Sequence, residues 1–281
     1  MDDVVLELRG LGKDYGARRA VDAIDLDVRR GEIFGMLGPN GAGKTTTISM
    51  ACGVLPPSRG RVRIDGHDLV TARFAAKRAI GLVPQDLALY DELSPRQNLT
   101  YFAELYGLAG AELATRIDWA LGIAGLTDRA DDRVKTFSGG MKRRLNLTAG
   151  MIHKPTLLVC DEPTVGVDPQ SRRHIFEAIK QLRADGMTIL YTSHYMEEVE
   201  ELCDRVAIVD GGKVVACGSL DELTRAHRGD RLALDLSGEP AVLAAALAAI
   251  ELTGATVERR AAAGGLEATF LALTGRGLRD G

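Results

Sequence analysis

The segment "GPNGAGKTT" at residues 38–46 constrains the fold of this chain more than any other. It matches the pattern G-x-x-x-x-G-K-[ST], follows the apolar run "IFGML" and precedes a helix-forming run. That order predicts a strand, a loop whose N–H groups surround phosphates, and a helix, with Lys44 reaching the β- and γ-phosphates and Thr45 ligating Mg²⁺. The alternative is a glycine-rich turn with an exposed lysine. The expected nucleotide-binding residues of this loop are Gly38, Pro39, Asn40, Gly41, Ala42, Gly43, Lys44, Thr45 and Thr46.

Five continuous apolar runs predict strands that are buried on both faces of a parallel sheet, at 33–37, 79–85, 156–163, 188–194 and 205–212. Helical patterns lie between them, at 44–53, 95–107, 112–124, 139–152, 170–185 and 195–203. The helix at 95 has a clear start, with Ser94 as N-cap, Pro95 at the first position and Gln97 completing a capping box. The main body is therefore predicted to be α/β.

Alternating segments at 4–10, 20–32 and 60–69 predict antiparallel strands, with Asp65 and Gly66 marking a turn. Around residue 220 the sequence changes to an Ala-rich helical pattern, a strand-like "GATVERR" and a final "LEATFLALTG". We expect a nucleotide-binding domain over 1–221, with a helical subdomain at about 86–152, and a small α+β appendage over 222–281.

Polar side chains follow three of the predicted core strands. "LLVCDEP" places Asp161 where it could ligate Mg²⁺ and Glu162 where it could orient or deprotonate a water. His194 and Gln85 end two other core strands, and parallel strands bring such ends to one edge of a sheet. His194 could then touch a γ-phosphate, and Gln85 could meet Mg²⁺ or the attacking water. The alternative for each is a strand end that emerges into solvent.

A second candidate phosphate site lies in "TFSGGMKRRL" at 136–145. Ser138, Gly139 and Gly140 lead into a helical run, a geometry that points N–H groups at an anion. The alternative is an ordinary helix N-cap after a flexible turn. Arg143 and Arg144 form either a solvated basic face or an electrostatic reinforcement of the phosphate site, and we favour the first. Cations at the start of a helix oppose its dipole, so we expect them to have acidic partners.

Together these motifs resemble the ATP-binding subunit of ABC transporters, over about residues 4–220. In family terms the chain has Walker A "GPNGAGKTT", Q-loop Gln85, signature "FSGGMKRRL", Walker B "LLVCDEP", a D-loop ending at Asp168 and H-switch His194, in family order. The resemblance implies a P-loop NTPase core, hydrolysis of ATP with Mg²⁺, and stacking of adenine on Tyr15, which is expected in the loop before the second strand.

The resemblance also implies partners. In this family two ATP-binding domains meet head to tail, and Ser138, Gly139 and Gly140 of one copy cap the ATP held by the other. A separate integral-membrane permease would hold the chain at the cytoplasmic face of the plasma membrane. Part of residues 86–107 is expected to form the groove for a permease helix and the rest to form the core of a helical layer. The apolar and aromatic residues of this segment are Leu89, Tyr90, Leu93, Tyr101, Phe102 and Tyr106.

Phe137 and Met141 depart from the commonest signature, LSGGQ, and we do not carry the role of the glutamine over to Met141. The variant is similar to the drug-exporting branch typified by daunorubicin-resistance ATPases. Branches that move polysaccharide, lipid, sodium or haem share parts of the pattern. An importer subunit would more usually have LSGGQ. A soluble ABC ATPase acting on DNA or ribosomes is the other class of alternative, but the chain has no long coiled coil and room for one such domain only.

Composition fits a folded soluble protein, with 46% hydrophobic and 26% charged residues. The net charge of −4 gives no support to a nucleic-acid binder, so no nucleic-acid partner is expected. Cys52, Cys160, Cys203 and Cys217 are scattered, which favours reduced core thiols over a metal or disulfide framework. No secretory signal follows Met1, and the apolar stretch 241–250 is too short to span a bilayer.

Overall fold

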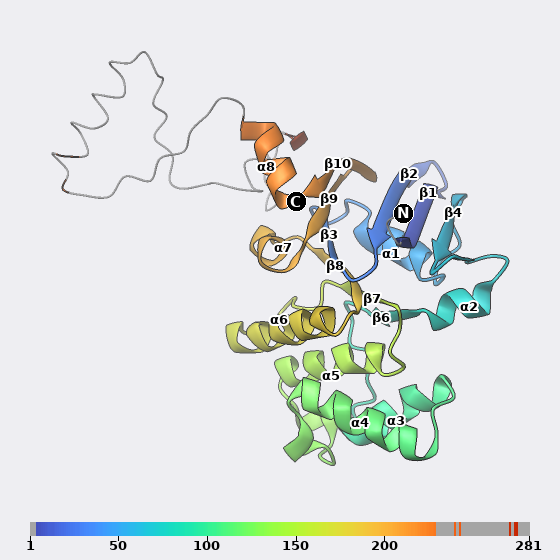
Figure 1. The fold of residues 1–281 in the computed structure, drawn as a ribbon, viewed down its shortest axis with the longest axis vertical. Helices are drawn as coiled ribbons and strands as arrows, with labels where there is room; N and C mark the ends of the chain where they lie inside the picture. The colour runs from blue at the N-terminus through green and yellow to red at the C-terminus, as the bar shows by residue number, and fades with distance from the viewer. Residues whose placement is uncertain (1–3, 229–238, 240–241, 243–269, 271–272, 275–281) are drawn as a thin grey trace.

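A computed structural model of the chain describes residues 4–228 together with Glu239, Val242, Phe270, Leu273 and Thr274. In Figure 1 the antiparallel sheet lies at the upper right, the parallel sheet descends from β10 to β6 near the middle, and the helices α3, α4 and α5 lie together below it. The α/β class with an antiparallel layer, a parallel sheet and a helical layer is therefore confirmed. Within the described residues no helix is long and apolar enough to cross a membrane.

The antiparallel sheet has four strands in the order β2-β1-β4-β5. These are β1 (Val4–Tyr15), β2 (Arg18–Arg29), β4 (Arg59–Ile64) and β5 (His67–Asp68). Asp65 and Gly66 both have positive φ and form the predicted turn between β4 and β5. The first strand was predicted to end at Gly10, which is wrong: it continues through register shifts to Tyr15 because bulges absorb the glycines that interrupt the alternation.

The second sheet has six strands in the order β10-β9-β3-β8-β7-β6. The members are β3 (Ile33–Leu37), β6 (Ile80–Val83), β7 (Leu157–Asp161), β8 (Thr188–Ser193), β9 (Arg205–Asp210) and β10 (Lys213–Ser219). All pairings are parallel except that of β10 with β9, so the five predicted core strands are confirmed. The prediction missed β10, which follows β9 by a tight turn.

The six predicted helices are present with small shifts at their ends: α1 (Lys44–Ala51), α3 (Pro95–Leu105), α4 (Gly110–Ala124), α5 (Gly139–Met151), α6 (Pro169–Ala184) and α7 (Met196–Leu202). The capping box of α3 is confirmed, since the Ser94 hydroxyl accepts the Gln97 N–H at 3.2 Å and the Gln97 side chain accepts the Ser94 N–H at 2.9 Å. Among the described residues two further α-helices were not predicted, α2 (Arg73–Arg78) and α8 (Leu220–Arg228), nor were the short 3-10 helices Thr127–Arg129 and Val134–Thr136.

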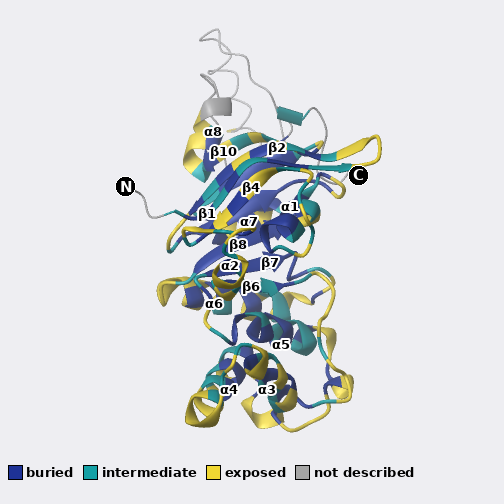
Figure 2. Ribbon diagram, turned by 90° about the vertical axis from the view of Figure 1, so that its right-hand side faces the viewer, coloured by how far each residue is buried: buried dark blue, intermediate teal, exposed yellow. Residues whose placement is uncertain are grey.

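Three buried apolar clusters hold these layers together. One joins the antiparallel sheet to α1 and one face of the parallel sheet, the second joins the other face to α6 and α7, and the third lies inside the helical layer. Figure 2 shows the corresponding buried surfaces of strands and helices. Phe270 is fully buried in the second cluster, together with Leu223 of α8. Most of the expected α+β appendage lies outside the described residues, and α8 begins at Leu220, directly after β10.

All four cysteines are unpaired. Cys52, Cys160 and Cys203 are buried as expected, whereas Cys217 on the edge strand β10 is exposed, so the prediction of a core thiol is wrong for that residue.

Candidate nucleotide-binding site

The glycine-rich loop connects β3 to α1 as predicted. Gly43 has a φ of 102° and Gly41 a φ of 80°, a region that favours glycine. At Gly38 a Cβ would lie 2.2 Å from the Val209 carbonyl oxygen, so the loop passes too close to β9 for any other residue. These backbone constraints leave the N–H groups of the loop and of the first turn of α1 as the donors of a phosphate-binding cradle.

The Lys44 side chain is almost fully buried and is already held in this loop. Its Nζ donates to the carbonyl oxygens of Gly38 at 2.6 Å and Pro39 at 3.1 Å, and lies 3.2 Å from Glu162 Oε1. Burial lowers the pKa of Lys44, while the charge of Glu162 acts in the opposite direction. The ammonium group is therefore part of a buried, hydrogen-bonded cluster and is not an exposed lysine on a turn.

Asp161 and Thr45 meet at the carboxyl end of β7. The Thr45 hydroxyl lies 3.5 Å from Asp161 Oδ1, which also accepts the Thr192 hydroxyl at 2.8 Å. A hydroxyl and a carboxylate at this separation suit Mg²⁺, which keeps several waters and needs few protein ligands beside the phosphates. Among the described residues no group of three or more His, Cys, Asp and Glu side chains is placed to hold a metal.

Glu162 stands between two of the predicted site residues. Its Oε2 lies 3.1 Å from His194 Nδ1 and its Oε1 lies 3.2 Å from Lys44 Nζ. Its backbone has a φ of 46°, which is uncommon for a residue with a side chain, and the Thr192 hydroxyl accepts its N–H at 3.0 Å. Backbone strain of this kind persists where the surrounding structure enforces it, often at functional sites. The predicted neighbourhood of Lys44, Glu162 and His194 is therefore present in one chain.

Gln85 lies two residues after β6 and is exposed. Its carbonyl oxygen accepts a hydrogen bond from Arg143 of α5, which also donates to the Val165 carbonyl at 3.3 Å. Arg144 donates to the Ala124 and Gly125 carbonyls. The prediction of a solvated face is thus wrong for both arginines: both are half-buried, and their guanidinium groups donate to carbonyl oxygens at loop and helix ends. Burial lowers the pKa of each, and the acidic partners act through charge, Asp86 on Arg143 and Asp168 on Arg144. Arg143 thereby links the signature helix to the Q-loop.

The signature segment forms the start of α5, with Ser138 as N-cap. The Ser138 hydroxyl accepts the Met141 N–H at 3.3 Å, so the ordinary N-cap interpretation is confirmed as its role within one chain. Ser138 and Gly139 are exposed. Gly140 is buried against the start of α6, where a Cβ would lie 1.9 Å from the Ser171 hydroxyl oxygen. The helix α5 packs on α3, α4, α6 and β6 and also contacts β7, while α1 packs on β1, β2 and β7, and Figure 1 shows α1 well above α5.

The two remaining predicted residues are exposed. Asp168 is the N-cap of α6, where it accepts the Ser171 N–H at 2.9 Å, and this hydrogen bond lowers its pKa. Tyr15 is the last residue of β1, not a loop residue as predicted, and Lys13 Nζ lies 5.4 Å from its ring centroid. Half of the Tyr15 side chain remains accessible to a planar ligand.

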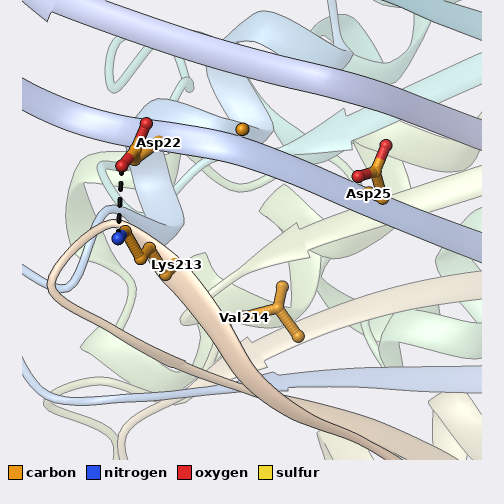
Figure 3. A pocket seen from close by; sticks show the side chains of 5 residues that line it. Asp22, Asp25, Lys213 and Val214 are labelled. Atoms are coloured by element: carbon orange, nitrogen blue, oxygen red, sulfur yellow. Dashed lines mark ion pairs between the residues drawn. The ribbon is translucent and has the colours of Figure 1, made fainter.

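A separate cavity of about 430 Å³ lies beside the loop between β9 and β10. Asp22, Ala23, Asp25, Lys213 and Val214 line it, as Figure 3 shows. Its acids are occupied: Asp22 pairs with Lys213 at 3.4 Å, and Asp25 accepts the Gly10 N–H at 2.8 Å. None of the motif residues lines this cavity, so it is not the nucleotide site.

Thr192 was not among the predicted site residues, although it contacts both acids. The register of β7 with β8 pairs Asp161 directly with Thr192. Knowledge of that register would have identified Thr192, but the register is a property of the folded sheet and is not visible in the pattern of either strand alone.

We expect Asp161→Asn to raise the melting temperature of the nucleotide-free protein by about 2–4 °C, the shift that roughly 1 kcal/mol produces in a domain of this size. Burial is the main cause that raises the pKa of Asp161, so its charged form opposes folding, and stability should fall as the pH rises from the ordinary aspartate pKa, about 3.9, to the raised pKa of the folded chain. Asn keeps an acceptor for Thr192 without the charge. Calorimetry over a pH series that starts near the ordinary aspartate pKa measures the difference.

Asp168→Asn is the matched control because the pKa of Asp168 is lowered, so its charge supports folding above the ordinary pKa of an aspartate. This variant should be less stable than the parent at neutral pH and approach it as the pH falls. A change in melting temperature in the same direction for both variants at neutral pH would contradict the prediction.

A glycine loop between a parallel strand and a helix, with an acidic pair at the end of a neighbouring strand, defines a P-loop nucleotide-binding protein. The comparisons with known proteins are more specific. Residues 21–165 match the family model described as "ABC transporter". The chain belongs to this family and is an ATP-binding subunit that hydrolyses ATP.

Several relatives cover most of the chain. It is 48% identical to the linearmycin resistance ATP-binding protein LnrL of Bacillus subtilis, over 81% of this chain and 73% of that one. It is 42% identical to the daunorubicin resistance ATP-binding protein DrrA3 of Streptomyces coeruleorubidus, over 92% of this chain and 81% of that one. It is also 42% identical to the Nod factor export ATP-binding protein I of Cupriavidus metallidurans, over 78% of this chain and 72% of that one. The resemblance to the drug-exporter branch is therefore confirmed.

Solved structures support the fold. A structure titled "Structure of ATP binding subunit of ABC transporter" superposes with a TM-score of 0.72 at 32% identity, covering 79% of this chain and 92% of that chain.

Proposed function

We propose that this chain powers the export of a hydrophobic natural product or drug, as one of two identical ATPase subunits that act on a separate permease. The observation that carries the proposal is that one chain contains the Lys44–Glu162–His194 cluster together with a signature segment whose Ser138 and Gly139 are exposed at the start of α5. The names of LnrL and DrrA3, which refer to resistance against antibiotics, support the class of cargo.

Within each site, Lys44 and the N–H groups of residues 38–46 bind the phosphates, and Tyr15 stacks on the adenine. Thr45 and Asp161 would hold Mg²⁺, with Gln85 approaching from the end of β6, and the bound ion would supply charge neutralisation for the phosphates. Glu162 orients and deprotonates the attacking water, and His194 contacts the γ-phosphate and holds Glu162 in place through the 3.1 Å contact.

The signature of the second copy completes each site. Ser138 and Gly139 are exposed at the positive end of α5, so they can approach an ATP held by another chain. Asp168 lies at the start of the neighbouring α6 and reaches the same interface. ATP then joins the two chains, and hydrolysis releases them. Because the proposed permease lies in the plasma membrane, the subunit bound to it would lie at the cytoplasmic face of that membrane.

The permease is proposed to dock on an exposed apolar face beside Gln85. Leu87, Tyr90, Tyr101 and Leu105 are all between 38% and 65% exposed. Tyr90 and Tyr101 contact each other edge to face at 5.0 Å between centroids, which gives the face a defined shape. By contrast, Leu93 and Phe102 are half-buried, and Phe102 packs against the core of the helical layer, as part of the segment was expected to do.

Co-purification tests this proposal directly. We expect the chain to co-purify with a permease encoded next to it, and its ATPase activity to rise in the presence of the cargo. Leu105→Glu should lose this association, because it places a charge in the docking face, while Val215→Glu should keep it. Val215 is also exposed but lies on β10, at the opposite edge of the sheet from β6.

Export of a molecule like a Nod factor is the second candidate, because the Nod factor export relative has the same 42% identity as DrrA3, over 78% of this chain where DrrA3 covers 92%. ATPase stimulation by linearmycin or daunorubicin supports the first candidate, and stimulation by a Nod factor alone supports the second. An ATPase that responds to neither, and binds no permease, would contradict the transport role.

A further inference from the structure

A buried carboxylate lies behind the Glu162–His194 pair. Glu198 of α7 is only 2% exposed, and its two oxygens accept three hydroxyl groups. Thr164 donates to Oε1 at 2.8 Å, while Tyr191 at 3.0 Å and Ser193 at 2.7 Å donate to Oε2. A carboxylate at this depth is costly unless it is paired and hydrogen-bonded, so the arrangement of the three donors is tightly specified.

A cation completes the surroundings of Glu198. Arg172 Nε of α6 lies 3.6 Å from Oε1, and the Arg172 guanidinium also lies 5.6 Å from the Tyr195 ring centroid. Tyr191 is fully buried, and burial together with the Glu198 charge raises the pKa of its phenol well above 10. Tyr191 therefore stays protonated and keeps donating to the carboxylate at all physiological pH values.

The donors come from the two segments that carry the reactive residues. Thr164 follows Glu162 by two residues, in the connection that ends at Asp168. Ser193 directly precedes His194, and its hydroxyl also accepts the Tyr195 N–H at 2.9 Å, which fixes the turn around His194. One carboxylate thus fastens the backbone beside both members of the Glu162–His194 pair.

We propose that Glu198 is a positioning residue for ATP hydrolysis, which holds the Thr164 segment and the Ser193–Tyr195 turn in one fixed relation. It touches no nucleotide; it acts by keeping Glu162 and His194 aligned and by tying this alignment to the segment that leads to Asp168. The inference rests on the proposed roles of Glu162 and His194.

Glu198→Gln tests the proposal with little change in volume. The amide presents an N–H donor where an oxygen accepted hydroxyl groups, so the two segments lose their common anchor. We expect kcat to fall roughly 10- to 100-fold, as misplacement of a reacting group does, while KM for MgATP changes by less than about twofold. The matched control is Glu201→Gln on the same helix, where an exposed carboxylate pairs with Lys180 at 2.7 Å; it should keep the parent kcat.

A double-mutant cycle separates positioning from a general loss of stability. Thr164→Val and Ser193→Ala should be non-additive in kcat, because both act through Glu198, and each should have little further effect in the Glu198→Gln background. If Thr164, Ser193 and Glu198 only stabilise the fold, the variants should have lower melting temperatures, an unchanged kcat per folded site and additive effects in the cycle. An unchanged kcat or additive effects on kcat would overturn the proposal.

If Glu198→Gln does not fold, Thr164 alone carries the test. Thr164→Val should lower kcat and Thr164→Ser, which restores the hydroxyl, should recover it; equal kcat values for Val and Ser would overturn the proposal. Failure of the proposal for Glu198 can be distinguished from failure of the proposed function. A Glu162→Gln variant that still hydrolyses ATP removes the base role, whereas an inactive Glu162→Gln beside a fully active Glu198→Gln removes only the role of Glu198.

Discussion

Glu162→Gln is expected to bind ATP as the parent chain does and to hydrolyse it roughly 10²- to 10⁴-fold more slowly, the usual loss on removing a general base. The amide retains the shape of the side chain and can still contact His194, but it cannot accept a proton from water. ATP is then bound and not consumed, so the variant should accumulate as an ATP-bound dimer. Size-exclusion chromatography with MgATP and phosphate-release assays measure the two effects.

The contact between Glu162 and Lys44 predicts that the same variant also differs from the parent in stability. In the nucleotide-free chain the buried Lys44 ammonium has the Glu162 carboxylate 3.2 Å away, and Gln removes that charge. We expect the nucleotide-free variant to be less stable than the parent, because the buried ammonium loses its paired charge, whereas the stabilisation by ATP should equal that of the parent. Glu177→Gln, an exposed position on α6, serves as the control and should change neither property. Normal hydrolysis by Glu162→Gln would exclude the base role.

The parts of the site that sequence could predict are those that depend on one strand and the loop after it. "IFGML" followed by a glycine-rich loop fixes where Lys44 and Thr45 lie, because the loop and the first turn of α1 leave few conformations for them. Asp161 and Glu162 are predicted for the same reason, since a buried strand that ends in acids must deliver them to the carboxyl edge.

The parts that sequence could not predict depend on how separate segments come together. Thr192 meets Asp161 through the register of β7 with β8, and Glu198 meets Thr164 through the packing of α7 against the connection after β7. Arg143 looked like a surface cation because its partners are carbonyl oxygens, which any residue type can supply. Polar groups satisfied by the backbone leave no trace in side-chain patterns.

Short and irregular elements account for the errors in the fold. The strand β1 contains Gly10 and Gly12, which break the alternation that a strand pattern requires, yet bulges carry it on to Tyr15. The helix α2 has only six residues and one buried position, Ala76, so no periodic pattern could reveal it. Local signals of this length are weaker than the tertiary contacts that decide them.

Ser138→Arg is expected to abolish ATP hydrolysis while nucleotide binding at each separate Walker A loop remains. Ser138 is exposed at the start of α5, so an arginine fits in the isolated chain, but its side chain and charge fill the space through which the second copy must reach ATP. Gly140 is a poorer choice, because a side chain there clashes with Ser171 of the same chain and disturbs its fold. Ser138→Gly controls for the lost N-cap, which costs only a few tenths of a kcal/mol with glycine.

Mixing this variant with Lys44→Ala tests whether the two halves of a site come from different chains. A head-to-tail pair of the two variants has one site with both halves intact, namely Lys44 from the Ser138→Arg chain and Ser138 from the Lys44→Ala chain. Random pairing of equal amounts makes about half of the dimers mixed, so about a quarter of all sites should be intact and activity should reappear on mixing two inactive proteins. Sites built within single chains predict no recovery at any ratio, since neither chain then contains both Lys44 and Ser138. Recovery that follows the product of the two concentrations, and is lost when Ser138→Arg also carries Lys44→Ala, would assign the signature to the partner's ATP.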